Sequence, residues 1–163
     1  QSMSSPNAVQ RGMTLRRGTG GHFNNMIIDG FSGETIDIKD VETVARLDKR
    51  QLSFAGLLIS NIGRDGSGFF AAEKGVDQDD DGGFDEARYF ENVARLGVAA
   101  QFRSSVTELA QPEFRLQADS PAREGAAAVP EDEFWDESAD YIGAVRPGAN
   151  RTWMEGWTAF PEH

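Results

Sequence analysis

The chain has 163 residues, a length that fits one domain able to bury a core without disulfide bonds. It carries 16 Lys and Arg against 27 Asp and Glu, a net charge of −11, which argues against nucleic acid or anionic lipid as the main ligand. The absence of Cys excludes disulfides, thiol nucleophiles and zinc–thiolate sites. No run of 18 apolar residues occurs, so the sequence predicts no membrane-spanning helix.

Residues 11–63 read as a series of short strands separated by Gly turns. The segments 13–17 and 35–38 alternate apolar and polar residues, a pattern typical of β-strands. Two longer segments, 23–31 (FNNMIIDGF) and 54–62 (FAGLLISNI), share one pattern at a spacing of 31 residues. Between them, the apolar spacing in residues 41–50 predicts a short amphipathic helix.

These similarities indicate an internal repeat. Residues 35–38 lie 22 positions after residues 13–16, and the helix at 41–50 accounts for the longer spacing of 31 in the second pair. Coils of about 20–25 residues that stack each strand on its equivalent are typical of a β-solenoid. Asn24, Asn25 and Asn61 suit turn positions, or ladders of stacked side chains, between coils. The alternative is a β-sandwich with two similar strands.

The rest of the chain is predicted to close the same domain, 1–163, with a helix-and-loop C-terminal cap. Residues 64–83 are a Gly- and Asp-rich loop, 84–97 a helix, and 98–163 a surface-wrapping segment that ends in an aromatic cap. The late aromatic residues either seal the core or bind a sugar or a partner; they are Trp135, Tyr141, Trp153, Trp157 and Phe160. The fold class is therefore mainly β, a short parallel β-solenoid with this cap.

A calcium loop is the sharpest candidate site. The spacing of acidic residues around a Gly turn matches the first half of an EF-hand calcium loop. The candidate ligands are Asp77, Asp79, Asp81, Gly83 and Asp85. The bidentate Glu expected at position 12 is replaced by Arg88. The alternative is a solvated acidic loop before a helix, where acidic side chains favour the helix N-terminus. Calcium is the one cofactor that the sequence suggests.

No motif predicts catalysis. Residues 18–21 fail both Gly-rich phosphate-binding patterns, and a turn explains them better. His22 is the only His besides the terminal His163, too few for a catalytic triad or a His metal site to be expected. Asp29, Asp37 and Asp40 could meet on neighbouring strands, as in β-helix enzymes that cleave polysaccharides. We expect a protein that is not an enzyme.

Several segments resemble a known bacterial family: "RGMTLRRGTGGHFNNMIIDGF", "GFDEARYF", "AVPEDEFWDESADYIGAV" and "WMEGWTAFP". They are similar, in the same order, to the C-terminal part of secreted or surface right-handed parallel β-helix repeat proteins of Bacteroidota- and Gemmatimonadota-like bacteria. The resemblance covers nearly all of residues 10–160. It implies a right-handed parallel β-helix in the periplasm or at the cell surface, and it carries over no catalytic residue.

These observations lead to an expected function as a structural protein. Members of the family usually carry more coils upstream, so we expect an open N-terminal coil end that docks on other protein subunits. The expected partner-binding residues are Arg11, Arg16 and Arg17, which precede the first acidic residue at Asp29. The chain would serve as a scaffold or extrinsic subunit of a larger assembly, such as a photosynthetic or respiratory membrane complex, with a signal peptide already removed. The alternative is a carbohydrate-binding or polysaccharide-cleaving surface protein.

Overall fold

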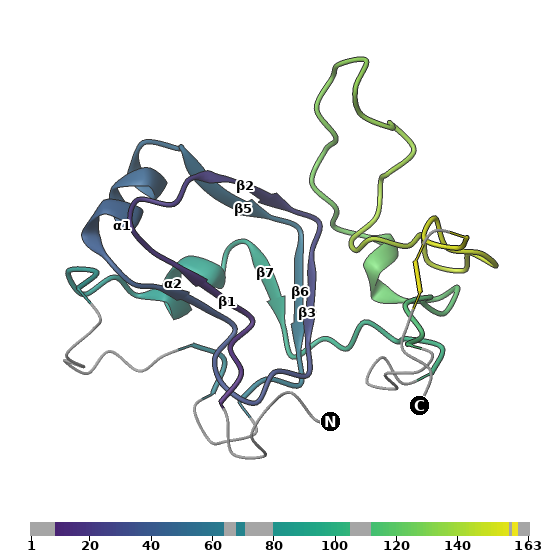
Figure 1. The fold of residues 1–163 in the computed structure, drawn as a ribbon, viewed down its shortest axis with the longest axis horizontal. Helices are drawn as coiled ribbons and strands as arrows, with labels where there is room; N and C mark the ends of the chain where they lie inside the picture. Colours follow the sequence, from purple (N-terminus) through teal and green to yellow (C-terminus); the bar gives the residue numbers. More distant parts are fainter. Residues whose placement is uncertain (1–8, 64–67, 71–79, 105–111, 157, 160–163) are drawn as a thin grey trace.

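The computed structural model describes residues 9–63, 68–70, 80–104, 112–156 and 158–159, and it confirms the predicted mainly-β class (Figure 1). The elements in chain order are β1 (Met13–Leu15), β2 (Gly21–Asn24), β3 (Ile27–Asp29), β4 (Ile36–Ile38), α1 (Val41–Asp48), β5 (Leu52–Ala55), β6 (Leu57–Ser60), α2 (Glu86–Phe90), β7 (Ala94–Leu96) and the 3-10 helix η1 (Pro121–Arg123). No helix among these residues is long and apolar enough to cross a membrane.

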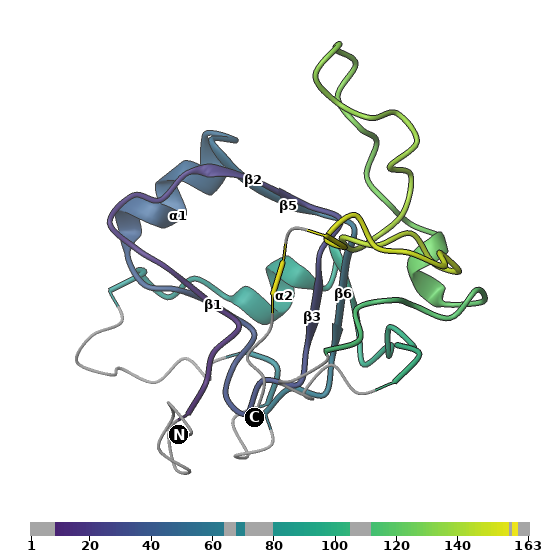
Figure 2. The same cartoon turned by 45° about the vertical axis from the view of Figure 1, so that its right-hand side comes forward.

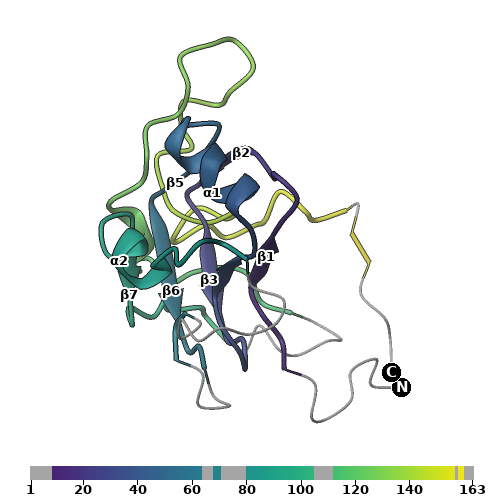
Figure 3. The same ribbon diagram turned by 90° about the vertical axis from the view of Figure 1, so that its left-hand side faces the viewer.

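The strands pair in parallel with strands one repeat later in the chain. β1 pairs with β4, β2 with β5 and β3 with β6, and β7 lies on the far side of β6. Figure 1 shows β2 running beside β5, and Figures 1 and 3 show β3 running beside β6. Phe23 lies opposite Phe54 and Ile27 opposite Leu58, which confirms the predicted spacing of 31 residues. Each of the three sheets is small, with two or three strands.

The first pair of strands corrects the other predicted spacing. The sequence suggested 22 residues, but Met13 lies opposite Ile36 and Leu15 opposite Ile38, a spacing of 23. The observed register sets apolar side chains side by side in the core, where Ile36 and Ile38 are fully buried. A shift of one residue would turn one of the two strands inside out, because side chains alternate between the faces of a strand.

The predicted helix at 41–50 is confirmed as α1, and Asp40 caps its N-terminus. The Asp40 carboxylate accepts hydrogen bonds from the Thr43 main-chain N at 2.8 Å, from Thr43 Oγ1 at 2.6 Å, and from the main-chain N of Arg17. Burial alone raises the pKa of Asp40, but the hydrogen bonds from Thr43 and Arg17 outweigh it and hold the pKa below its usual value. Because Arg17 follows β1, this one carboxylate ties the first turn of the chain to α1.

We expect Asp40→Ala to lower the free energy of unfolding by about 1–2 kcal/mol at neutral pH, through loss of the helix cap. Since the folded pKa of Asp40 is depressed, its charge stabilises the fold above the unfolded pKa of about 4, and this contribution is lost as the pH falls through the folded pKa. The difference between wild type and variant in urea unfolding should therefore shrink between pH 6 and pH 3. A difference that stays constant over this range would contradict the assignment.

The predicted helix over 84–97 is wrong in its second half. α2 covers only Glu86–Phe90, and Ala94–Leu96 forms strand β7, parallel to β6. The Val93 carbonyl accepts a hydrogen bond from the main-chain N of Leu57 at 3.3 Å as this pairing begins. Residues 94–96 form a strand because they can pair with the edge of β6, which lies far away in the sequence. This pairing outweighs the helical pattern of apolar residues in the segment.

The main core lies between the strands, and α2 closes one end of it. Ile38 of β4 and Ile59 of β6 are fully buried. Phe90 of α2 is also fully buried, stacks on Phe70 with ring centroids 5.2 Å apart, and meets Phe54 of β5 edge-on at 5.0 Å. Figure 1 shows α2 within the outline formed by the strands. α2 therefore plugs the core on the side of β4–β6.

The C-terminal part packs against the outer face of β6. Apolar residues from four separate places in the chain form a second core here, and they are Leu58, Ala100, Leu116, Ala122 and Ile142. Besides η1, the described residues of this part contain one isolated antiparallel bridge, between Phe102 and Leu116. The expected helix-and-loop cap is thus mostly loop, and it covers the side of the strands (Figure 2).

The late aromatic residues that the structure describes do not belong to the main core. Trp135 and Trp153 are 49% and 58% exposed, and Phe134 is 84% exposed. Tyr141 is half-buried and lies under the Arg146 guanidinium, 4.9 Å from its ring centroid. The other two residues predicted in this cap, Trp157 and Phe160, lie outside the described part of the chain.

Candidate interaction surfaces

We use "first coil" for residues 13–29, which contain β1, β2 and β3, and "second coil" for residues 36–60, which contain β4, β5 and β6. Within the described residues, the first coil pairs on one side only. Gly21 and Asn25 donate main-chain N–H groups to the second coil, to Gln51 O at 2.8 Å and Ala55 O at 2.9 Å. In a parallel ladder alternate residues direct their main-chain groups to opposite sides. The main-chain N–H and C=O groups of the intervening residues therefore face away from the second coil. These residues are Thr14, His22 and Asn24, and all three are exposed. We call this row the first-coil edge.

Two of the three predicted partner-binding arginines are exposed beside the first-coil edge. Arg16 and Arg17 follow β1 directly, and both side chains are exposed. Arg11 is engaged differently, because its guanidinium forms an ion pair with Glu34 and lies 3.3 Å from Asp37 Oδ2. The structure thus assigns Arg11 to the fold and leaves Arg16 and Arg17 as candidates for binding.

Further cations lie beside Arg17. A shallow hollow of about 340 Å³ lies between Arg17, Gly18 and one side of α1. Its other charged lining residues are Arg46 of α1, Lys49 directly after α1, and Glu42 as the one acidic residue. The sequence alone did not reveal this grouping, since Arg17 and Lys49 are 32 positions apart. It makes the corner between β1 and α1 locally basic in a chain of net charge −11.

The described part of the candidate calcium loop uses its carboxylates locally. Asp81 Oδ1 accepts a hydrogen bond from Gly83 N at 2.8 Å, and Asp85 Oδ1 caps α2 by accepting from Arg88 N at 2.9 Å. No group of three or more His, Cys, Asp or Glu suited to a metal ion occurs among the residues that the structure describes. Two candidate ligands, Asp77 and Asp79, lie outside those residues, so calcium binding stays a prediction.

The structure brings His22 beside Ser53, a contact that sequence reasoning missed. The two residues are opposite each other on β2 and β5, and His22 Nδ1 lies 2.7 Å from Ser53 Oγ. The spacing of 31 residues was the signal that could have found the pair. A nucleophilic Ser also needs a third residue that orients its base and a pocket for the oxyanion. Among the described residues, no third side chain is hydrogen-bonded to this exposed pair.

The three carboxylates considered for catalysis do not form a pair. Asp40 caps α1, while Asp37 lies 3.1 Å from Lys39 Nζ and is 1% exposed. Asp29 Oδ1 accepts hydrogen bonds from Ser60 Oγ at 2.6 Å and from Asn61 Nδ2 at 2.7 Å. Each carboxylate thus has its own structural partners.

A long acidic loop, residues 128–142, leaves the body of the protein beside the first coil (Figures 1 and 2). Both of its ends are held by Asn25, the residue after β2. The Asn25 side chain donates from Nδ2 to Ala127 O at 3.1 Å and accepts at Oδ1 from Ala127 N at 2.7 Å. The Asn25 carbonyl accepts from Gly143 N at 2.6 Å. The loop is thus pinned at its base, a role beyond the turn predicted for Asn25.

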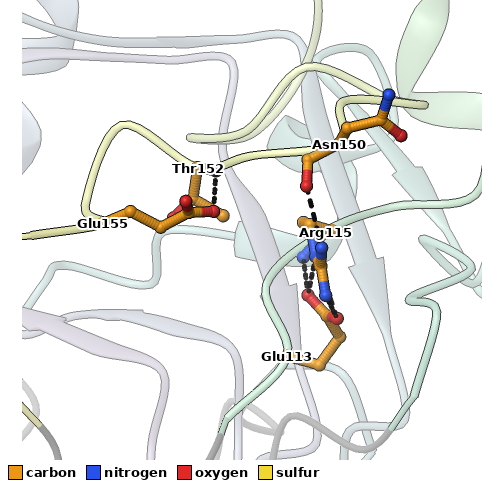
Figure 4. Close-up of polar contacts among 5 residues, drawn as sticks. All are labelled: Glu113, Arg115, Asn150, Thr152 and Glu155. Carbon is orange, nitrogen blue, oxygen red and sulfur yellow. Dashed lines mark hydrogen bonds and ion pairs between the residues drawn. The ribbon is translucent and has the colours of Figure 1, made fainter.

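Hydrogen bonds and ion pairs order residues 150–155, which follow this loop, and connect them to residues 113–115, which precede it (Figure 4). Arg115 Nε lies 2.8 Å from Glu113 Oε1, and Arg115 Nη1 donates to Asn150 O at 2.9 Å. Glu155 accepts from Thr152 N at 2.9 Å and from Arg151. The hydrogen bond from Arg115 lowers the pKa of the Glu113 carboxyl, and that from Arg151 lowers the pKa of Glu155. These contacts hold the late part of the chain in place near Phe114.

Two grooves adjoin the C-terminal part. One, of about 560 Å³ and mostly apolar, lies between residues 24–27 of the first coil and residues 143–145, with Phe102, Phe114 and Met154 along it. The other, of about 850 Å³, is lined by residues 125–133 with Glu137 and Asp140, and is acidic. No family model, no curated protein and no solved structure matches this chain, so its function is argued from these surfaces.

Proposed function

We propose that this chain is a non-catalytic structural protein, a short right-handed parallel β-solenoid that docks on other protein subunits outside the cytoplasm. It would act as a scaffold or extrinsic subunit of a larger assembly, including one bound to a membrane. The parallel pairing of β1–β3 with β4–β6 supports the solenoid, because each turn of such a fold buries its apolar face against the next turn. The resemblance to secreted β-helix proteins supports the location.

The observation that carries the proposal is the first-coil edge. Main-chain groups at His22 and Asn24 point away from the second coil, and both side chains are exposed. Natural proteins usually cover or charge such edges, because an open edge pairs with other strands. Here the edge is short and bordered by Arg16 and Arg17. Its best occupant is an extended, acidic segment of another protein, added as a strand.

The other end of the strand stack gives the contrast, because α2 covers the core there and β7 adds a third strand beside β6. Phe90 of α2 fills the core there, and α2 packs against β4. The molecule thus has one open strand edge, and a helix covers the core on the opposite side. This asymmetry suits a subunit that docks through one face.

Isolation of the native protein under mild conditions tests the proposal. We expect a complex of fixed stoichiometry, identified by light scattering and mass spectrometry. The double variant Arg16→Glu/Arg17→Asn should weaken that complex by at least about tenfold, and Asn tolerates the positive φ of 57° found at Arg17. Arg88→Glu on α2 is the matched control, since it reverses an exposed charge at the plugged end.

Two results would overturn the proposal. One is recovery of the native protein as a free monomer. The other is a complex that the Arg16/Arg17 double variant binds as tightly as the wild type, because docking would then not involve this edge. In both variants, circular dichroism should confirm the wild-type fold, so that lost binding is not mistaken for unfolding.

Carbohydrate binding is the second candidate, and one observation favours it. The acidic groove of about 850 Å³ lies in the same loop as the exposed Phe134 and Trp135. Exposed aromatic rings beside polar groups can stack on sugars. The two rings are not part of the groove lining, however, and they meet at 85°, so they offer no shared flat platform. The protein-docking function therefore has the better support.

A further inference from the structure

We propose that the pair Phe134–Trp135 on the acidic loop is a second docking element, which inserts into an apolar pocket with a basic rim on a partner protein. This surface is separate from the first-coil edge, and its argument does not depend on the function proposed above. It begins with exposure: Phe134 is 84% exposed and Trp135 is 49% exposed. Their rings contact each other edge to face, with centroids 5.2 Å apart.

The two rings project from the loop without covering a core. Neither belongs to one of the two apolar clusters of the protein, although half-buried Phe23 and Tyr89 do. Large aromatic side chains contribute most to binding when a partner desolvates them, and they are frequent at the centres of protein interfaces. Adjacent exposed rings thus point to a contact with another molecule.

The base of the loop is fixed, which limits the region that the rings can occupy. Asn25 pins Ala127 and Gly143 at the two ends. Arg146 holds the C-terminal end of the loop in two ways. Its Nη1 donates to Asp140 Oδ1 at 3.1 Å, and its guanidinium carbon lies 4.9 Å from the centroid of the Tyr141 ring. A surface that is ordered before binding loses less conformational entropy in the complex, which favours affinity.

Charge identifies the chemistry of the partner. Residues 128–142 contain six acidic side chains and no Lys, Arg or His, and they are Glu131, Asp132, Glu133, Asp136, Glu137 and Asp140. All six are exposed. Complementary charge around an apolar anchor raises the association rate and excludes acidic partners. The rim of the pocket that receives Phe134 is therefore rich in Lys or Arg.

The same charges disfavour other occupants. A second copy carries a net charge of −11, and its basic hollow beside Arg17 has only one apolar side chain, Ala45, to receive the rings. Anionic lipid would repel the loop. Ionised carboxylates only accept hydrogen bonds, whereas sugar hydroxyls are best bound by donors and acceptors together. A protein surface with an apolar pocket and basic side chains can bury the rings and also pair with the carboxylates.

Site-specific photo-crosslinking in the producing cells tests this proposal on the full chain. The photoreactive residue p-benzoylphenylalanine is placed at position 134, and in a control at position 91, where Glu91 is exposed directly after α2. We expect ultraviolet light to join position 134, but not position 91, to one protein. The crosslinked peptide should lie beside Lys or Arg residues that border an apolar pocket.

The identified partner then allows a quantitative test with purified proteins. Phe134→Ala should weaken binding by at least about tenfold, as expected for an interface anchor. The double variant Glu131→Gln/Glu133→Gln should weaken it by at least about threefold and flatten its dependence on salt. Asp48→Asn and Glu91→Gln, which neutralise exposed acids elsewhere, should change it by less than about twofold.

The outcomes separate this proposal from the function proposed above. A crosslink to polysaccharide, to a second copy or to an acidic surface would overturn it, and so would the absence of any crosslink. Loss of the crosslink at position 134 in the Arg16→Glu/Arg17→Asn variant would show that the loop has no docking role of its own. Retention of the crosslink in that variant supports an independent element, whatever the fate of the first-coil edge.

Discussion

Phe90→Ala is expected to lower the free energy of unfolding by about 3–5 kcal/mol, the range typical of removing a buried aromatic side chain. Phe90 is fully buried, stacks on Phe70 and contacts Phe54 edge-on. Its loss leaves a cavity at the point where α2 closes the core, and three aromatic contacts, with Phe54, Phe70 and Tyr89, disappear with it. Urea unfolding followed by circular dichroism measures the change.

Phe134→Ala is the matched control for this prediction, because it removes the same side chain from a position that is 84% exposed. We expect a change within about 0.5 kcal/mol. Equal losses at positions 90 and 134 would contradict the role of Phe90 as the plug of the core. They would also show that Phe134 packs in the folded protein, against the second docking element proposed above.

Gly56→Ala is expected to cost about 2–4 kcal/mol and to release the base of the acidic loop. Gly56 has φ +65°, a conformation that disfavours L side chains. An added Cβ would lie 2.5 Å from Asn25 Oδ1 and 2.9 Å from Ala127 N, the two atoms that hold the loop. We therefore expect faster proteolytic cleavage within residues 128–142, together with a lower free energy of unfolding.

Gly30→Ala separates strain from steric conflict. Gly30 has φ +82°, but an added Cβ meets nothing within 4 Å. We expect this control to cost only about 1–2 kcal/mol, from the positive φ, and to leave cleavage of the loop unchanged. If both variants released the loop equally, the clamp at Asn25 would not be what holds it.

Part of the fold could be predicted because it is written in local patterns. The segments 23–31 and 54–62 show the same order of apolar residues, and α1 has both its amphipathic spacing and its cap, Asp40. The turns of the two coils match at equivalent positions: Asn25 stands where the next coil has Gly56, and both have positive φ. Asn and Gly share this tolerance, so the equivalence is visible to physical reasoning despite the change of residue.

The candidate surfaces were less predictable, because they join distant parts of the chain. Arg16 and Arg17 could be named from the sequence, but only the structure shows that Arg11 is held by Glu34 while these two are exposed. The link between Asn25 and Ala127 spans 102 positions and has no sequence signature. Side-chain amides hydrogen-bond wherever the fold brings a main-chain segment, so such contacts depend on packing.

The sequence by itself determined the mainly-β class, the spacing of 31 residues that relates β2 and β3 to β5 and β6, and the position of α1, because periodicity and capping act over a few residues. Only the tertiary structure decided that residues 94–96 form β7, since the edge of β6 outweighs local helical preference. It also decided which charges and aromatic rings are exposed. Exposure depends on what the rest of the chain covers, and no local pattern contains that information.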